Sequence, residues 1–398
     1  MKNIAVFTGN RAEFGLQAPL LHELKNSENF NLTLLVAASH IDPEFGSTIK
    51  EIEESGFEVD YKIDFKHDKD NIEENPKTIS VGINLVTEAL KEINPDLFVV
   101  YADRYEGFAA VIASTQMGIV TAHIEGGDVT EGGTFDDSVR HAMSKLSHLH
   151  FTTNSEASLR IQQLGENPKH IFEVGLPSVD LIKNKNFTNS QKIISKYELN
   201  NIDKLIVFTQ HSVPINNSDI KSEFIEIENA LKKLTTEKFK IICTYPNSDI
   251  GGKEIIETLK NWDNSYEFIN LYKSLGREDF HGLLDLNNST KIQVCYLGNS
   301  SAGIKETPAL KCPSVILGDR QKGRLSSSNI IYSGIETQSI VESLDVAFNG
   351  KEFLKEVKNC KNPYGSGNMA KKTLKILSEL SLNQSFLKKK FFDIKLVD

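Results

Sequence analysis

Apolar runs of strand length alternate with longer helical patterns along most of the chain. Near the amino terminus an apolar run at residues 4–8 precedes a helical pattern at 16–25, and a run at 31–37 precedes one at 46–55. Short, continuous apolar runs separated by helices are typical of parallel strands that are covered on both faces. The pattern therefore predicts an α/β fold built on doubly wound parallel sheets.

The alternation occurs in two successive series, which predicts two Rossmann-like domains that face one another across a cleft. We expect an amino-terminal domain at residues 1–177, a second domain at 178–368, and a segment at 369–398 whose amphipathic helix packs back on the first domain. Ligands of such folds bind beyond the carboxyl ends of the strands, so we expect the substrate in the cleft. The later strands are expected at 97–100, 118–122, 148–152, 204–208, 239–244, 266–271, 292–297 and 314–317.

Composition narrows the classes of partner. The 398 residues carry 45 Lys and Arg against 54 Asp and Glu, and this net charge of −9 leaves no overall basic surface for nucleic acid. The four cysteines lack the spacing of a metal site, and no apolar stretch reaches the ~18 residues of a membrane span. We therefore expect a cytoplasmic protein without signal peptide, membrane anchor or bound metal.

Polar motifs follow the expected strands of the first domain. They are the turn 9–15 with Arg11, the pair Asp103-Arg104, the run 123–128 and the run 136–141. A Gly-Gly pair inside the run 123–128 lets the backbone approach a ligand, because glycine carries no Cβ atom. Arg11 and a helix start are suited to binding an anion, although the 9–15 segment alone could equally be an ordinary turn.

Three carboxylates in these motifs, Asp103, Glu125 and Asp136, are the candidates for acid and base chemistry. Because they reach the same sheet edge from neighbouring strands, their pKa values can be driven apart, which divides acid and base roles among them. The alternative for Asp103 is a helix cap with a surface ion pair, since Asp is a favoured capping residue.

Residues suited to holding a nucleotide follow the strands of the second domain. Small hydroxyl residues begin a helix expected at 301–309, where N–H and O–H groups can bind a diphosphate and Glu306 can accept from ribose hydroxyls. The alternatives are a well-capped helix here, a plain turn at 245–249 and a structural His211. Residues 388–390, three lysines, are expected to be solvated. The candidates are His211, Asn247, Ser300, Ser301, Gly303, Glu306 and Arg320.

In their order along nearly the whole chain, these motifs resemble those of the hydrolysing UDP-N-acetylglucosamine 2-epimerases of sialic-acid and legionaminic-acid biosynthesis. The matching segments are 9–15, 103–104, 123–128, 136–141 and 298–303. The chain departs from that family at Tyr101-Ala102, where many members have Gly before the Asp-Arg pair, and at Asp128, where Glu is frequent. Neither departure removes a proposed catalytic group, but both could report a different sugar.

The resemblance implies a glycosyltransferase-B arrangement, with UDP held by the second domain and the sugar facing the first. It also implies loss of the C2 proton as the diphosphate leaves C1, then hydration of the 2-acetamidoglucal to a free 2-epimerised sugar, without a cofactor. The resemblance further implies a nucleotide sugar as the partner and a homodimer or homotetramer. The implied roles are catalysis for Asp103, Glu125, Asp136 and His211, nucleotide binding for Arg11 and Arg104, and sugar binding or support for His40, Asp128, Arg140 and His141.

Other activities share these features. The same reaction on UDP- or GDP-linked 2,4-diacetamido-2,4,6-trideoxyglucose is one, and a retaining glycosyltransferase, which needs an acceptor, is another. Non-hydrolysing epimerases usually carry His-Val-Glu-Ala-Gly where this chain has His-Ile-Glu-Gly-Gly at 123–127. A sugar-nucleotide sensor without catalysis is disfavoured by three carboxylates at one sheet edge.

Overall fold

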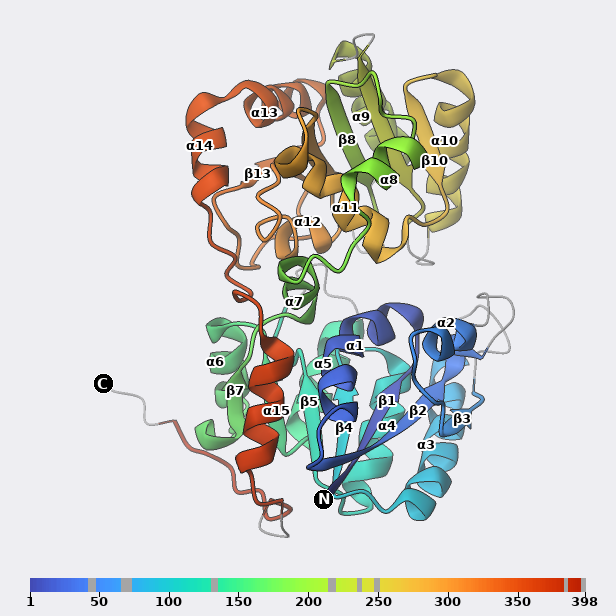
Figure 1. Cartoon of the computed structure of the whole chain (residues 1–398), viewed down its shortest axis with the longest axis vertical. Coiled ribbons are helices and arrows are strands. Elements are labelled where there is room, and N and C mark those ends of the chain that lie inside the picture. Colours follow the sequence, from blue (N-terminus) through green and yellow to red (C-terminus); the bar gives the residue numbers. More distant parts are fainter. Residues whose placement is uncertain are drawn as a thin grey trace. The chain divides into compact units, whose positions relative to one another are not determined.

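The computed structural model describes residues 1–41, 48–65, 74–129, 135–213, 220–234, 238–246, 251–382 and 386–394. It divides into two compact units. The first unit contains the described residues up to Asp180 and those from Gly367 onward, and the second contains Leu181–Ser366. Each unit has one wholly parallel sheet covered by helices, which confirms the predicted α/β class (Figure 1).

The first unit has a sheet in the order β3-β2-β1-β4-β5-β6-β7. β1 lies in the interior of the sheet, and the later strands are added outward on both sides of it, as in doubly wound nucleotide-binding folds. Its strands are β1 (Lys2–Thr8), β2 (Phe30–Ala37), β3 (Tyr61–Ile63), β4 (Leu97–Tyr101), β5 (Thr121–Ile124), β6 (Leu149–Thr152) and β7 (Ile171–Glu173). Its helices are α1 (Arg11–Lys25), α2 (Ile49–Glu54), α3 (Glu74–Ile93), α4 (Tyr105–Gln116), α5 (Phe135–Leu146), α6 (Ser155–Gln163) and α15 (Met369–Glu379), and α7 (Pro177–Lys183) crosses the boundary between the units.

The second unit repeats this order around its own central strand, as β10-β9-β8-β11-β12-β13. Its strands are β8 (Lys204–Thr209), β9 (Phe239–Thr244), β10 (Ile269–Tyr272), β11 (Gln293–Gly298), β12 (Ser314–Leu317) and β13 (Ile330–Ser333). Its helices are α8 (Ser190–Lys196), α9 (Ile220–Leu234), α10 (Gly252–Ser265), α11 (Gly276–Ser289), α12 (Ala302–Lys305), α13 (Thr337–Asn349) and α14 (Lys351–Asn359).

The strands are mostly apolar because helices cover both faces of each sheet. In β1, Ile4 and Val6 belong to one buried apolar cluster, and Ala5 and Phe7 belong to another. Successive side chains of a strand point to opposite faces, so a run without polar alternation specifies burial on both sides. Within the described ranges, no helix is both long and apolar enough to cross a membrane.

Several elements differ from their predicted bounds, and β5 and α12 show why. β5 begins at Thr121, three residues into the apolar run at 118–122, and extends through Ile124. Gly118, with φ of +71°, turns the chain after α4, and the strand begins only where Thr121 pairs with Phe98 of β4. The helix predicted at 301–309 is the single turn α12, because Pro308 disfavours helical backbone in the residue before it.

α15 belongs to the first unit and lies against α1 (Figure 1). The Asp180 carboxylate accepts hydrogen bonds from the N–H groups of Met369 and Ala370 at 2.8 and 2.9 Å. A carboxylate at this position also compensates the positive end of the helix dipole. At the other end, Lys2 Nζ donates to the carbonyls of Leu377 and Leu380 at 2.7 and 2.6 Å.

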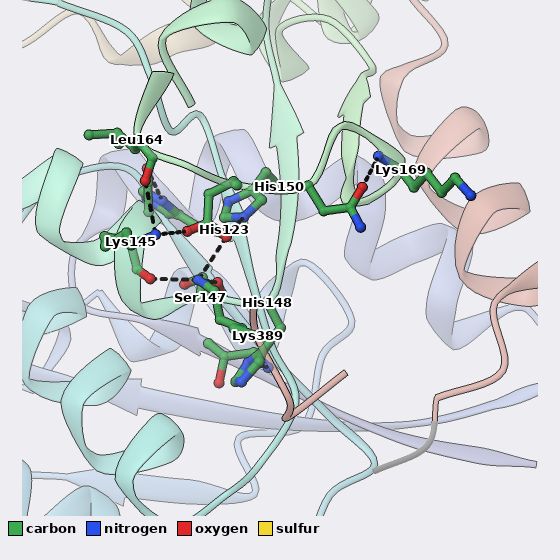
Figure 2. A network of polar contacts seen from close by, with 12 residues as sticks. His123, Lys145, Ser147, His148, His150, Leu164, Lys169 and Lys389 are labelled. Carbon is green, nitrogen blue, oxygen red and sulfur yellow. Dashed lines mark hydrogen bonds and ion pairs between the residues drawn. The ribbon is translucent and has the colours of Figure 1, made fainter. Parts of the chain in front are cut away.

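Residues 386–394 also pack on the first unit, where Lys389 joins a polar network with Lys145 and Ser147 (Figure 2). Lys389 Nζ donates to the Glu166 carboxylate at 2.8 Å and to the carbonyls of Lys145 and Ser147 at 2.5 Å each. Burial alone would raise the pKa of Glu166, but hydrogen bonds from His150, Lys145 and Lys389 lower it to about 2. Residues 388–390 are exposed, as predicted, but the ammonium group of Lys389, whose side chain is 25% exposed, is bound within the protein.

Candidate active site

Residues with left-handed backbone close the neighbouring strands β4 and β5. Ala102 has φ of +58° and Glu125 has φ of +65°. The strands are in register, with Tyr101 opposite Ile124, and the Ala102 N–H donates to the Ile124 carbonyl at 3.0 Å. This backbone costs a residue with a Cβ roughly 1–2 kcal/mol, so surrounding contacts must hold it. The two turns bring Asp103 and Glu125 out at the same sheet edge.

Arg140 of α5 connects the segments that follow these strands. Its guanidinium donates to the Asp103 carboxylate, to the Asp137 carboxylate at 2.7 Å and to the Asp128 backbone carbonyl at 3.0 Å. The Arg140 side chain is 6% exposed, so these acceptors replace the water that its charge has lost. We call Asp103, Asp128, Asp137 and Arg140 the first-unit cluster. Arg140, predicted as a supporting residue, lies at its centre.

Side chains of β4 and β5 form hydrogen bonds with the two turns. The Tyr101 hydroxyl donates to Glu125 Oε2. His123 Nε2 bonds the Ala102 carbonyl at 2.6 Å, and its Nδ1 bonds the Ser144 hydroxyl at 3.0 Å. A carbonyl can only accept, so Nε2 carries the hydrogen. Burial lowers the pKa of His123 to about 4, so the ring is neutral at pH 7.

The Gly126-Gly127 pair is required by packing. A Cβ on Gly126 would lie 2.5 Å from the Ser144 hydroxyl oxygen. Gly127 has φ of +79°, and its Cβ would lie 2.3 Å from the Ala157 carbonyl oxygen. The turn after β5 therefore rests directly on α5 and α6, a contact that the sequence interpretation of room for a ligand did not include.

The first turn of α5 places its two acidic residues differently. Asp136, the predicted catalytic residue, is exposed, whereas Asp137 contacts Arg140. His141 is half-buried on the same helix, and burial lowers its pKa. Its Nδ1 has no hydrogen-bond partner among the residues that the structure describes. Asp137 was not predicted, because it is adjacent to Asp136 on α5 and the sequence does not show which of the two side chains faces Arg140.

His40 follows β2 at the same edge of the sheet but is engaged within the protein. Its ring nitrogens bond the hydroxyls of Thr8 at 3.0 Å and Thr48 at 2.6 Å. Burial lowers the pKa of His40 to about 4, so it is a neutral, internally satisfied ring. The Arg11 side chain and Asn247, both predicted to bind the nucleotide, lie outside the described residues.

A buried pair of carboxylates at the first βα turn was not predicted. Glu106 is 1% exposed and accepts from Arg104 Nε and Nη2 at 3.3 and 3.4 Å. Glu13 accepts from the Gly9 N–H at 2.9 Å, and burial together with Glu106 raises its pKa to about 7. Burial and the neighbouring Glu106 carboxylate therefore both favour the protonated form of Glu13. The three-residue spacing of Asn10 and Glu13 is typical of a helix start, and it indicates where Glu13 lies on α1. The spacing does not indicate that Glu13 is buried.

In the second unit, Asn299 ties together the ends of β8 and β11. Its side chain accepts from the His211 N–H at 2.7 Å and donates to the His211 carbonyl at 2.8 Å. Its own carbonyl accepts from Arg320 at 3.1 Å and from Gln321 at 2.9 Å. Burial, with Arg320 nearby, lowers the pKa of His211 to about 3. His211 is therefore neutral at pH 7 and can contact a phosphate only as a neutral hydrogen-bonding group.

The start of α12 is more internally bonded than predicted. The Ser300 N–H donates to the Tyr296 hydroxyl at 3.2 Å, and the Gly303 N–H donates to the Ser300 carbonyl at 3.1 Å. Gly303 is buried against Tyr296, with a Cβ position 2.3 Å from that ring. Glu306, at the end of α12, bonds His281 at 2.6 Å. The Ala302 N–H donates to the Ser300 hydroxyl at 3.4 Å, so several donors at this helix start are engaged within the protein.

Comparison with known proteins decides the family. The family model for UDP-N-acetylglucosamine 2-epimerase matches residues 22–378. The chain belongs to the UDP-N-acetylglucosamine 2-epimerase family. Membership confirms the family that the motifs resemble, and it covers both units and α15.

Relatives within this epimerase family are similar over most of their length. The GDP/UDP-N,N'-diacetylbacillosamine 2-epimerase (hydrolyzing) of Campylobacter jejuni is 36% identical over 88% of each chain. The UDP-N,N'-diacetylbacillosamine 2-epimerase (hydrolyzing) of Legionella pneumophila is 30% identical over 98% of this chain and 99% of the relative. The structure of the UDP-GlcNAc 2-epimerase from Neisseria meningitidis bound to UDP-GlcNAc has a TM-score of 0.72 at 20% identity, covering 96% of this chain and 100% of that one. That likeness shows a shared fold.

Proposed function

We propose that this protein is a hydrolysing 2-epimerase, which converts a nucleotide-linked N-acetylated amino sugar and water to nucleoside diphosphate and a free 2-epimerised sugar. The observation that carries the proposal is the pair of strand-end turns bearing Asp103 and Glu125, in a chain 36% identical to a hydrolysing relative. Membership of the epimerase family supports the same assignment.

In the proposed reaction a carboxylate removes the proton from C2 of the sugar. The C2–H electron pair forms the C1–C2 double bond as the C1–O bond to the diphosphate breaks. Water then adds at C1, and a proton returns to the opposite face of C2. We propose Asp103, Glu125 and Asp136 as the acid and base set, with Arg104 and Arg320 stabilising the departing diphosphate.

We propose nucleotide-linked N,N'-diacetylbacillosamine, a 2,4-diacetamido-2,4,6-trideoxyglucose, as the first substrate to test. The names of the Campylobacter and Legionella relatives support it. UDP-N-acetylglucosamine is the second candidate, because the matching family is described by it. A cytoplasmic homodimer or homotetramer that serves the synthesis of sialic-acid or legionaminic-acid sugars remains part of the proposal.

The test is to incubate purified protein separately with UDP- and GDP-linked diacetylbacillosamine and with UDP-N-acetylglucosamine. Free nucleoside diphosphate and free sugar should form in equal amounts without an acceptor, and in deuterated water the product should carry deuterium at C2. Epimerised sugar still joined to its diphosphate would indicate a non-hydrolysing epimerase. Turnover that requires an added acceptor would indicate a glycosyltransferase.

A further inference from the structure

Tyr101 stands at the end of β4 in direct contact with a proposed catalytic carboxylate. It is 3% exposed and belongs to the apolar cluster that also contains Val99 and Ile124. That packing fixes the ring, and its hydroxyl donates to Glu125 Oε2 on the neighbouring strand. A buried phenol hydroxyl normally finds a partner, and here the partner is a group of the proposed site.

The contact is one half of a reciprocal connection between two strands. Tyr101 on β4 reaches Glu125 beyond the end of β5, while His123 on β5 reaches the Ala102 carbonyl beyond the end of β4 at 2.6 Å. Both targets are the residues with left-handed backbone, φ of +65° and +58°. Each strand therefore holds the strained turn of the other, and the two turns carry the proposed carboxylates.

We propose that Tyr101 is a positioning residue that aims the Glu125 carboxylate, so that it can accept the C2 proton. This inference rests on the proposed function. The phenol hydroxyl donates its hydrogen to one oxygen of the carboxylate, Oε2, which fixes the orientation of the group. The proton from C2 goes to the Glu125 carboxylate while the C1–O electrons leave with the diphosphate.

The chain offers a matched control for the loss of one phenol hydroxyl. Tyr197 is 2% exposed in the second unit, and its hydroxyl donates to the Asp279 carboxylate at 2.7 Å. Tyr101→Phe and Tyr197→Phe therefore remove the same group from the same kind of bond. The charged and titratable groups on the elements around Glu125 are unchanged in both variants: Asp103, Glu106, His123, Asp128, Asp137, Arg140 and His141.

Steady-state kinetics compares the two variants. Tyr101→Phe should lower kcat about tenfold or more with KM within about threefold, because the substrate still binds but the base is misaimed. The loss should therefore fall on kcat and not on KM. Tyr197→Phe should leave both kcat and KM unchanged. A Tyr101→Phe enzyme with the kcat of the wild type overturns the proposal.

Two further measurements test the role of Tyr101 without relying on the activity of Tyr101→Phe. Site-specific 3-fluorotyrosine at position 101 keeps the ring and is a stronger donor, so the carbon-13 chemical shift of the Glu125 carboxyl should change even if Tyr101→Phe does not fold. That chemical shift, measured at neutral pH and assigned with Glu125→Gln, requires no substrate. Inactivity of the wild type towards every sugar nucleotide would reject the proposed function alone. A Glu125 carboxyl chemical shift identical in the wild type and the position-101 variants would reject the role of Tyr101.

Discussion

Replacing Lys389 with methionine should destabilise the first unit by about 2 kcal/mol. The pKa of Glu166 falls from 4.5 to about 2 in a side chain that is 4% exposed, which corresponds to roughly 3 kcal/mol of linked stability. His150, Lys145 and Lys389 share that effect, so Lys389 accounts for about 1 kcal/mol. Its two bonds to backbone carbonyls add about another 1 kcal/mol, and methionine keeps most of the aliphatic packing.

Urea denaturation and thermal melting at neutral pH measure this loss. A change of about 2 kcal/mol should lower the melting temperature by roughly 4–8 °C for a unit of this size. Lys388→Met and Lys390→Met are the matched controls, since both lysines are exposed, and each should stay within about 0.5 kcal/mol of the wild type. A Lys389→Met protein no less stable than the Lys390→Met protein would refute the magnitude and its cause.

The pH dependence provides a second check on the same contact. Glu166 has a lowered pKa in the folded protein, so its stabilisation is complete above pH 4.5 and is lost as the pH falls toward about 2. The difference between wild type and Lys389→Met should therefore shrink over that range. A difference that stays constant would show that Lys389 acts through packing and not through the carboxylate.

Asp103→Asn, Glu125→Gln and Asp136→Asn should each slow diphosphate release by roughly a hundredfold or more in a folded protein, because an amide keeps the shape but not the proton transfer. Steady-state kinetics measures the rates, and circular dichroism shows that each variant is folded. Wild-type rates in all three variants would show that these carboxylates have a structural role and not a catalytic one. Arg320→Ala should weaken binding of free nucleoside diphosphate about tenfold, measured by calorimetry, and an unchanged Kd would place the nucleotide elsewhere. Lowering the pH below 6.5 should destabilise the fold, because His211, with its pKa lowered to about 3, takes up a proton only after unfolding. Denaturation at about pH 7 and about pH 4.5 measures this, and equal stability would contradict it.

The sheets and the strand-end motifs could be predicted because their signal is local. The centre of a strand such as β1 is apolar at four successive positions, 4–7, and in a parallel sheet the residues that follow neighbouring strands reach one edge whatever the details of the loops. Asp103 and Glu125 could be placed there by this reasoning. The start of β5 could not, because an apolar run does not show where pairing begins, and Gly118 occupies a turn within it.

The finer contacts depend on geometry that a single sequence does not encode. Each residue turns a helix by about 100°, so the choice between Asp136 and Asp137 as the partner of Arg140 rests on helix phase. The bond from Tyr101 to Glu125 depends on the register that sets Tyr101 opposite Ile124. The raised pKa of Glu13 arises from burial beneath Glu106, which becomes evident only once α1 and α4 are packed.

The first unit is assembled from both ends of the chain, and this has a consequence during synthesis. As the ribosome releases the polypeptide, residues 1–180 emerge first, but α15 and Lys389 emerge only after the whole second unit. The second unit can fold as soon as it is out, since it is continuous in the chain from Leu181 to Ser366. Until α15 emerges, the apolar side chains of the first unit that pack against Met369, Ala370 and Leu377 of α15 lack that cover.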